Sequence, residues 1–277
     1  MNKILPVLTV IITIFIVWYI AAIWLNSSWA YDKAMREGKQ LSSIELIADT
    51  WSQDKPKLPA PHQVVLEIWE TTAEKKITWI TLSATLLGFL LGTSFGILLA
   101  IGIVYNRVMD LSVMPWVIAS QTIPILALAP MIIVVLNAIG ISGLLPKAMI
   151  SMYLSFFPVV VGMVKGLRSP EIMQLDQMWT WNASPSQLFW RLRLPASTPF
   201  LFASLKVGVA ASLVGAIVGE LPTGAVAGLG ARLLAGSYYG QTIQIWSALI
   251  MAAALAALLV SIVGIVQRLT LKRMGMV

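Results

Sequence analysis

The sequence predicts an all-α, polytopic membrane protein with six transmembrane helices, on three observations. Of its 277 residues, 58% are hydrophobic and only 11% are charged, with a mean hydropathy of +0.84, whereas a soluble domain carries about 25% charged residues. Six apolar segments reach the roughly 20 residues that cross the hydrocarbon core. They are residues 4–25, 78–104, 113–137, 146–168, 196–220 and 242–267. The chain has no cysteine, which excludes disulfides and thiolate metal sites, and its single histidine, His62, lies in a Pro-rich polar stretch typical of a surface.

The first apolar segment is an N-terminal transmembrane anchor, residues 1–25, in our interpretation. Its apolar run exceeds the 7–15 residues of a signal-peptide core, and its basic region consists of Lys3 alone. We therefore expect the segment to be retained.

Residues 26–76 form the only long polar region, with seven basic and eight acidic residues. We expect an extracytoplasmic segment with two short amphipathic helices. The first, in "SSIELIADTW", has Ser43 as its N-cap. The second lies in "QVVLEIWETT". Between them, Pro56, Pro59 and Pro61 predict an extended stretch.

A core transmembrane domain is expected over residues 77–268, followed by a cytoplasmic tail at 269–277. Gly88, Gly92 and Gly96 are four residues apart and share one face of the second span. Small residues on one face allow close helix contact in lipid. We expect this face to pack tightly on a neighbouring helix.

The third span contains three prolines around "SQTIP". Backbone groups that proline frees inside a membrane need protein, Ser/Thr or water partners, so this helix is not expected to face lipid all round. Gln121 and Thr122, next to Pro124, either line a pathway or bond a neighbouring helix.

The polar interval at 169–195 is expected to fold as two short helices joined by a tight turn. Ser169-Pro170-Glu171 predicts the first start, and Ser184 with Gln187 predicts a capping box at the second. Asn182 sits where a left-handed residue would close the first helix. Pro195 is expected to end the second helix.

Two ionisable residues lie in or at the rim of the fifth span. Lys206 is about 15 Å deep at 1.5 Å per residue, and an intramembrane charge should face a cavity or a partner. It either lines a pathway, braces a dimer or makes an interhelical hydrogen bond. Glu220, at the rim, is either a gate or substrate contact or an interface anchor.

The polar interval and its flanking segments resemble the membrane subunits of ATP-binding-cassette (ABC) importers. Their hallmark loop reads Glu-Ala-Ala, a later Gly, and Ile-x-Leu-Pro. Here Asp176 opens the triplet, Asn182 replaces the Gly, and the ending is Leu192-Arg193-Leu194-Pro195. The stretches "LPAPHQVVLEIW", "TIPILALAPMIIV", "FFPVVVGMVKGL" and "GELPTGAVAGLG" are similar to the nitrate, sulfonate and taurine branch.

The resemblance implies a type I importer permease fold in which the interval is a cytoplasmic coupling helix seated on an ATPase subunit. The ATPase-coupling residues it implies are Asp176, Asn182, Ala183, Ser184, Gln187, Leu188, Phe189, Arg191, Leu194 and Pro195. The candidate pathway residues are Gln121, Thr122, Pro124, Lys206 and Glu220. The departures from the motif at Asp176 and Asn182 leave the strength of coupling open, and would also suit one half of an asymmetric pair.

A cytoplasmic interval places both termini inside. The inner segments then hold nine Lys/Arg, and the outer segments also hold nine, seven in 26–76 plus Lys147 and Arg232. Outside the long segment the ratio is nine to two, in agreement with the positive-inside rule. Lys75 and Lys76, beside the second span, count against this orientation.

The expected function is that of a permease, not an enzyme, in a prokaryotic inner membrane. The resemblance implies ABC ATPase subunits that carry ATP and Mg, a second permease copy or paralogue, and a periplasmic or lipid-anchored solute-binding protein. No cofactor bound by this chain and no nucleic-acid partner are expected, and the chain lacks a phosphate-binding G-x-x-x-x-G-K-[ST] loop.

The solute is a sulfonate, nitrate-like or taurine-like anion, or a vitamin precursor. The alternative is a secondary transporter or a channel subunit without an ATPase. An intramembrane enzyme is disfavoured, because no two mid-span carboxylates could act together.

Overall fold

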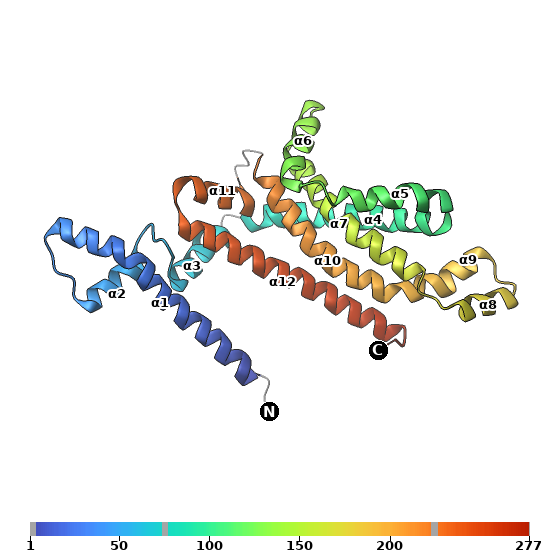
Figure 1. Ribbon diagram of the computed structural model, residues 1–277, viewed down its shortest axis with the longest axis horizontal. Helices are drawn as coiled ribbons and strands as arrows, with labels where there is room; N and C mark the ends of the chain where they lie inside the picture. Colours follow the sequence, from blue (N-terminus) through green and yellow to red (C-terminus); the bar gives the residue numbers. More distant parts are fainter. Residues whose placement is uncertain (1–3, 74–76, 223–226, 277) are drawn as a thin grey trace. The chain divides into compact units, whose positions relative to one another are not determined.

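The computed structural model describes residues 4–73, 77–222 and 227–276 and is helical throughout, with no strand in those ranges (Figure 1). Lys3, Lys75 and Lys76 lie outside the described residues. The α-helices are α1 (Ile4–Glu37), α2 (Ser43–Ser52), α3 (Pro61–Glu67), α4 (Ile77–Tyr105), α5 (Arg107–Ser120), α6 (Ile125–Ala138), α7 (Leu144–Leu167), α8 (Ile172–Thr180), α9 (Pro185–Leu188), α10 (Leu194–Glu220), α11 (Leu229–Tyr239) and α12 (Thr242–Arg273). Two π-helical segments are η1 (Ile68–Ala73) and η2 (Phe189–Arg193).

The all-α prediction is confirmed, with five helices long and apolar enough to span a membrane among the described residues. The bent pair α5 and α6 makes a sixth span if it is counted as one. The chain divides into two compact units. An N-terminal unit combines residues 1–78 with 231–252, and a core unit combines residues 79–230 with 253–277.

The prediction of one continuous helix over 113–137 was wrong. α5 ends at Ser120 and α6 begins at Ile125, with 103° between them. Pro124 is the N-cap of α6 and lacks the N–H that would donate to the Ser120 carbonyl one turn back. That carbonyl instead accepts a hydrogen bond from the Tyr153 hydroxyl of α7. A backbone group at the break thus finds a protein partner, as the prolines predicted.

α7 is the central helix of the core unit and is approached closely from both sides. Gly88, Gly92 and Gly96 of α4 face it, and a Cβ added at Gly96 would lie 3.0 Å from the Phe156 carbonyl. On the other side, Gly215 of α10 lies against the α7 backbone. The predicted tight packing of the glycine face is therefore confirmed.

Serine hydroxyls join the three helices inside this contact. The hydroxyl of the buried Ser151 of α7 hydrogen-bonds the hydroxyl of Ser212 of α10, at 2.6 Å, and the Ser212 carbonyl, at 2.8 Å. Ser212 in turn donates to the Thr85 carbonyl of α4 at 2.7 Å. Since helices in lipid gain little from apolar burial, such bonds and close packing fix their arrangement.

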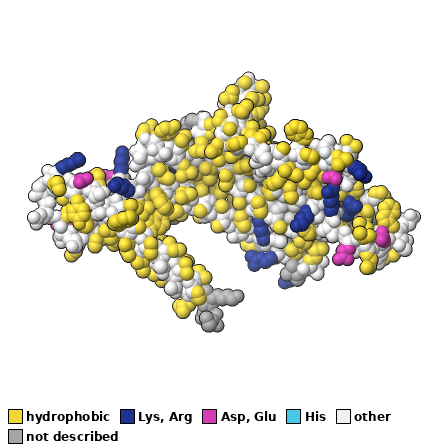
Figure 2. Space-filling model, viewed as in Figure 1, with side chains coloured by type: hydrophobic (Ala, Val, Ile, Leu, Met, Phe, Trp, Pro, Cys, Tyr) yellow, Lys and Arg dark blue, Asp and Glu magenta, His cyan; other side chains and the backbone are white. Residues whose placement is uncertain are grey.

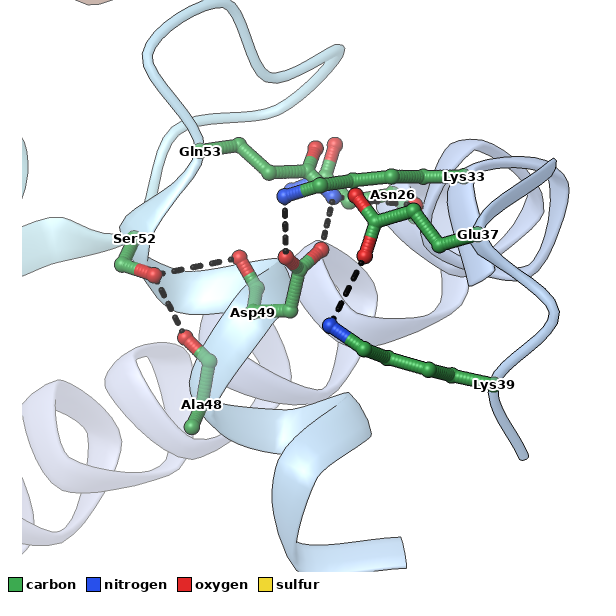
Figure 3. A network of polar contacts seen from close by, with 8 residues as sticks. All are labelled: Asn26, Lys33, Glu37, Lys39, Ala48, Asp49, Ser52 and Gln53. Atoms are coloured by element: carbon green, nitrogen blue, oxygen red, sulfur yellow. Dashed lines mark hydrogen bonds and ion pairs between the residues drawn. The ribbon is translucent and has the colours of Figure 1, made fainter. Parts of the chain in front are cut away.

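In the N-terminal unit, α1 continues as one helix well past residue 25. The buried Asn26 of α1 donates to the carbonyls of Thr50, at 3.2 Å, and Leu58, at 2.8 Å. Lys33 pairs with Asp49 at 3.4 Å, farther along the same two helices (Figure 3). These contacts hold α2 and the following stretch against the polar end of α1.

Two local predictions in this unit were wrong by a residue or more. The N-cap of α2 is Ser42, not Ser43, and its N–H donates to Glu45 at 2.8 Å. Pro61 begins α3 rather than extending the loop, because proline suits the first helical turn, where no N–H is needed. His62 is exposed, as expected, and lies 3.3 Å from the Tyr19 hydroxyl.

An ion pair also lies within the N-terminal unit. The Arg232 guanidinium, on the part of α11 that belongs to this unit, donates to the Glu67 carboxylate of α3. The Arg232 side chain is 9% exposed. Burial lowers the pKa of this guanidinium below its usual value, although the Glu67 charge opposes the effect.

Candidate functional site: the capped loop between α7 and α10

The first helix of the loop begins later than predicted. Its N-cap is Glu171, whose N–H donates to the Gln174 side chain at 3.1 Å. Ser169 belongs to the end of α7 instead, where its hydroxyl donates to the Gly166 carbonyl at 2.7 Å. Serine bonds a nearby carbonyl as readily as it caps a helix, and α8 therefore starts at Ile172.

Asn182 closes α8 as predicted, and no other non-glycine residue in the described ranges has a positive φ, here +52°. Its N–H donates to the Trp179 carbonyl at 2.9 Å, and the Ala183 N–H donates to the Met178 carbonyl at 3.0 Å. This pair of bonds is the Schellman motif, which satisfies the last carbonyls of a helix. The hydrogen bonds that define this turn are thus all formed by its own backbone.

The second helix begins with the predicted capping box. The Ser184 N–H donates to the Gln187 side chain at 2.9 Å, and the Gln187 N–H donates back to the Ser184 hydroxyl at 3.3 Å. α9 then passes through η2 into α10 without interruption, so residues Pro185–Glu220 form one 36-residue helix.

The prediction that Pro195 ends this helix was wrong. A proline inside a helix clashes with the carbonyl four residues back and cannot donate to it. Here the preceding turn is widened, and the Leu194 N–H donates to the Phe189 carbonyl, five residues back. The π-type turn rearranges the backbone just where an interior proline would disturb it. Pro195 is therefore accommodated in the first turn of α10.

Aromatic and ionic contacts attach the loop to the end of α4. Phe189 packs edge-on against Tyr105 with ring centroids 5.9 Å apart. The Arg193 guanidinium lies over the same ring, 5.5 Å from its centroid. At the entry to the loop, Arg168 pairs with Asp110 of α5 at 2.8 Å.

The outer surface of the loop is open and partly apolar. No residue of α8 or α9 is buried. Trp179, Trp181 and Trp190 are each more than 60% exposed. A small hollow between the two helices is lined by Met178, Trp179, Ala183, Pro185 and Leu188.

The predicted coupling residues all lie in this one hairpin and its continuation. Asp176, Asn182, Ser184, Gln187 and Arg191 are exposed. Ala183, Leu188, Phe189, Leu194 and Pro195 are partly buried and form its inner side. Figure 1 places α8 and α9 at one end of the core unit, together with the last turns of α12.

The predicted pathway residues lie in three separate places of the core unit. Gln121, Thr122 and Pro124 form the turn between α5 and α6. Lys206 is half-buried in the middle of α10, and a Cβ added at Gly264 of α12 would lie 3.8 Å from its ammonium nitrogen.

Glu220 is fully buried at the last residue of α10. Its carboxyl oxygens accept from the Thr81 hydroxyl, at 2.9 and 3.1 Å, and from the Gly230 N–H, at 2.7 Å. Lys147 of α7 is 8% exposed and interacts electrostatically with Glu220. An acidic group at the N-terminus of α11 is favoured by the helix dipole.

Sequence reasoning missed Thr81 and Lys147 as members of this cluster. Thr81 lies 139 positions from Glu220, so no local pattern connects them. Lys147 was assigned to an outer segment, although its place right after Pro146, at the start of an apolar run, allowed it to lie inside the helix.

Long apolar helices, one broken in its middle, and a folded helical hairpin outside them define a multi-pass, all-helical membrane protein. The chain belongs to the family of binding-protein-dependent transport system inner membrane components, whose model matches residues 92–276. It is the permease component of an ABC transporter.

Several relatives align with most of its length. It is 34% identical to the formylaminopyrimidine transport permease protein ThiX of Halalkalibacterium halodurans over 175 residues, 62% of this chain and 68% of the relative. It is 30% identical to the riboflavin transport system permease protein RibX of Chloroflexus aurantiacus over 218 residues, 78% of this chain and 80% of the relative. The putative aliphatic sulfonates transport permease protein SsuC of Bacillus subtilis is 25% identical over 218 residues, which cover 78% of this chain and 77% of the relative.

Proposed function

We propose that this permease couples solute import to ATP hydrolysis through residues 169–195, which dock on a separate ATPase subunit carrying ATP and Mg. The observation that supports it is the hairpin itself, capped at both helix starts and closed by Asn182 in a left-handed turn. A loop that only connects two spans needs neither helix caps nor a left-handed turn. Its exposed tryptophans offer the large apolar contacts that protein interfaces favour.

The hairpin lies on the cytoplasmic side in this proposal, with both chain termini. Eight of the nine Lys/Arg assigned to that side lie in the core unit, at the ends of α7 and α12, at the start of α5 and in η2. They are Arg107, Lys165, Arg168, Arg191, Arg193, Arg268, Lys272 and Arg273. Figure 2 shows Lys and Arg side chains gathered toward the end of the core unit that carries α8 and α9. Positive charge marks the cytoplasmic side of membrane proteins.

Two permease copies, or this chain and a paralogue, form the pathway, and a solute-binding protein delivers solute to the outer face. Gln121, Thr122 and Pro124 contribute the polar break in an apolar helix, which is tolerated in lipid only beside protein or a cavity. Lys206 supplies a positive charge within the span. Glu220 acts at the rim as a gate element.

The solute is a small polar compound, either an organic anion such as a sulfonate or a vitamin precursor. Two supports favour this class. The relatives named above are named for formylaminopyrimidine, riboflavin and aliphatic sulfonates, and Lys206 is a cation suited to an anionic group.

The test is to solubilise the tagged chain from its native membrane and identify what copurifies. We expect an ATPase with a phosphate-binding loop, with or without a second permease. A matched chain lacking residues 184–191 should insert into the membrane but lose the ATPase. A solitary chain that transports without ATP would refute coupling and favour a secondary transporter.

A further inference from the structure

Three helix ends meet at the Glu220 carboxyl group within the core unit. Glu220 ends α10, Thr81 lies in the second turn of α4, and Gly230 lies in the first turn of α11. The Thr81 hydroxyl accepts from the Leu229 N–H at 2.9 Å and donates to Glu220 at 2.9 Å. One side chain from each of two helices thus accepts a hydrogen bond from the buried start of a third helix.

The backbone before α11 is shaped to fit this carboxyl group. Gly228 has φ of +137°, a conformation that side-chain-bearing residues rarely adopt. A Cβ at this position would overlap the Glu220 carboxyl group. The close approach therefore requires glycine, and the contact is a built feature of the chain.

The cluster lies beside two of the points where the chain passes between its two units. One passage follows Thr78, three residues before Thr81, and another follows Gly230 itself. At its other end, the helix that terminates in Glu220 begins at Pro185, in the hairpin. At 1.5 Å per residue, these 36 residues span about 53 Å.

We propose that Glu220 is a positioning residue that fastens the second turn of α4 and the first turn of α11 to the end of α10. A displacement of the hairpin then reaches two of the connections to the N-terminal unit through one continuous helix. This inference rests on the proposed function, because it assumes that an ATPase moves the hairpin. It assigns to Glu220 a mechanical part in gating rather than contact with solute.

The experiment uses the full chain with its ATPase in proteoliposomes. Thr81→Val is nearly isosteric and removes the hydroxyl that links Glu220 to Leu229. Thr85→Val is the matched control, since Thr85 is equally buried one turn along α4 but its hydroxyl bonds the carbonyl of Thr81 in its own helix. Glu220→Gln is the second variant, in case Thr81→Val does not assemble.

Two readouts separate positioning from mere stability. The first is solute uptake per ATP hydrolysed, measured only on assembled complexes. The second is the labelling rate of Leu229→Cys by a thiol reagent. Leu229 is fully buried, and the chain has no native cysteine to interfere.

We expect Thr81→Val to lower uptake per ATP at least tenfold and to speed labelling at position 229, and Glu220→Gln to act in the same direction. Thr85→Val should stay within twofold of the wild type in both. An assembled Thr81→Val or Glu220→Gln complex with unchanged uptake per ATP, or with unchanged labelling, would overturn the inference. Failure of the wild-type chain to bind an ATPase would instead refute the proposed function.

Discussion

Replacing Asn182 by valine should weaken the attachment of the ATPase, and replacing it by glycine should not. Asn182 holds φ at +52°. Valine is β-branched and is the kind of residue least compatible with that conformation. Glycine adopts it freely.

The size of the effect follows from the left-handed turn. An L-residue without a compensating side chain loses about 1–2 kcal/mol in the left-handed conformation. No residue of α8 or α9 is buried, so few packing contacts are available to offset that loss of folding free energy. If the hairpin binds only when folded, the ATPase should bind about 5- to 30-fold more weakly, at 1.4 kcal/mol per tenfold.

The assay is equilibrium binding of the purified ATPase to the solubilised permease, compared across wild type, Asn182→Gly and Asn182→Val. Membrane yield of each variant provides the control for insertion. Binding of the valine variant within twofold of both others would show that the turn at Asn182 is not part of the docking structure.

Three other substitutions test the fold. Gly92→Leu should sharply lower the thermal unfolding temperature of the solubilised chain. A Cβ at this position already meets the α7 backbone at 3.0 Å, and overpacking costs about 1–3 kcal/mol or more. Gly92→Ala should have a milder effect, and equal effects of the two variants would contradict tight packing at this position. Tyr153→Phe should cost about 1 kcal/mol of stability, because the Ser120 carbonyl keeps only the long hydrogen bond from the Ile123 N–H, at 3.4 Å. Chemical denaturation in micelles checks this, and an unchanged midpoint would count against the contact. Arg232→Ala should destabilise the chain by about 1.5–3 kcal/mol, the range for loss of a charged hydrogen bond, because the pair with Glu67 is partly buried. Combining it with Glu67→Gln should recover part of the loss. Calorimetry that finds the double variant worse than the single one would refute the pairing.

Features that depend on neighbouring residues could be predicted from the sequence. The turn at Asn182 and the capping box at Ser184 are decided within a few positions, and both formed as expected. The small-residue face of α4 was recognisable because its members recur every four residues. Each of these signals is complete within one segment.

Features that depend on competition or on distant partners could not be predicted. Ser169 had two possible bonds, to the end of α7 or to the start of α8, and sequence gives no way to weigh them. Pro195 is a helix breaker unless a widened turn precedes it, and η2 leaves no recognisable pattern. The Thr81–Glu220 contact is set only when α4, α10 and α11 come together.

The widened turn at η2 allows the orientation of the hairpin to change independently of the orientation of the transmembrane span. A π-type turn holds one residue more than an α-helical turn, so everything beyond it is rotated by about 100° about the helix axis. Removing one residue from Phe189–Arg193 would turn the face of α9 by that angle while leaving the phase of α10 in the membrane untouched. The length of this short segment therefore sets the direction in which the face of α9 points, separately from the residues that compose it.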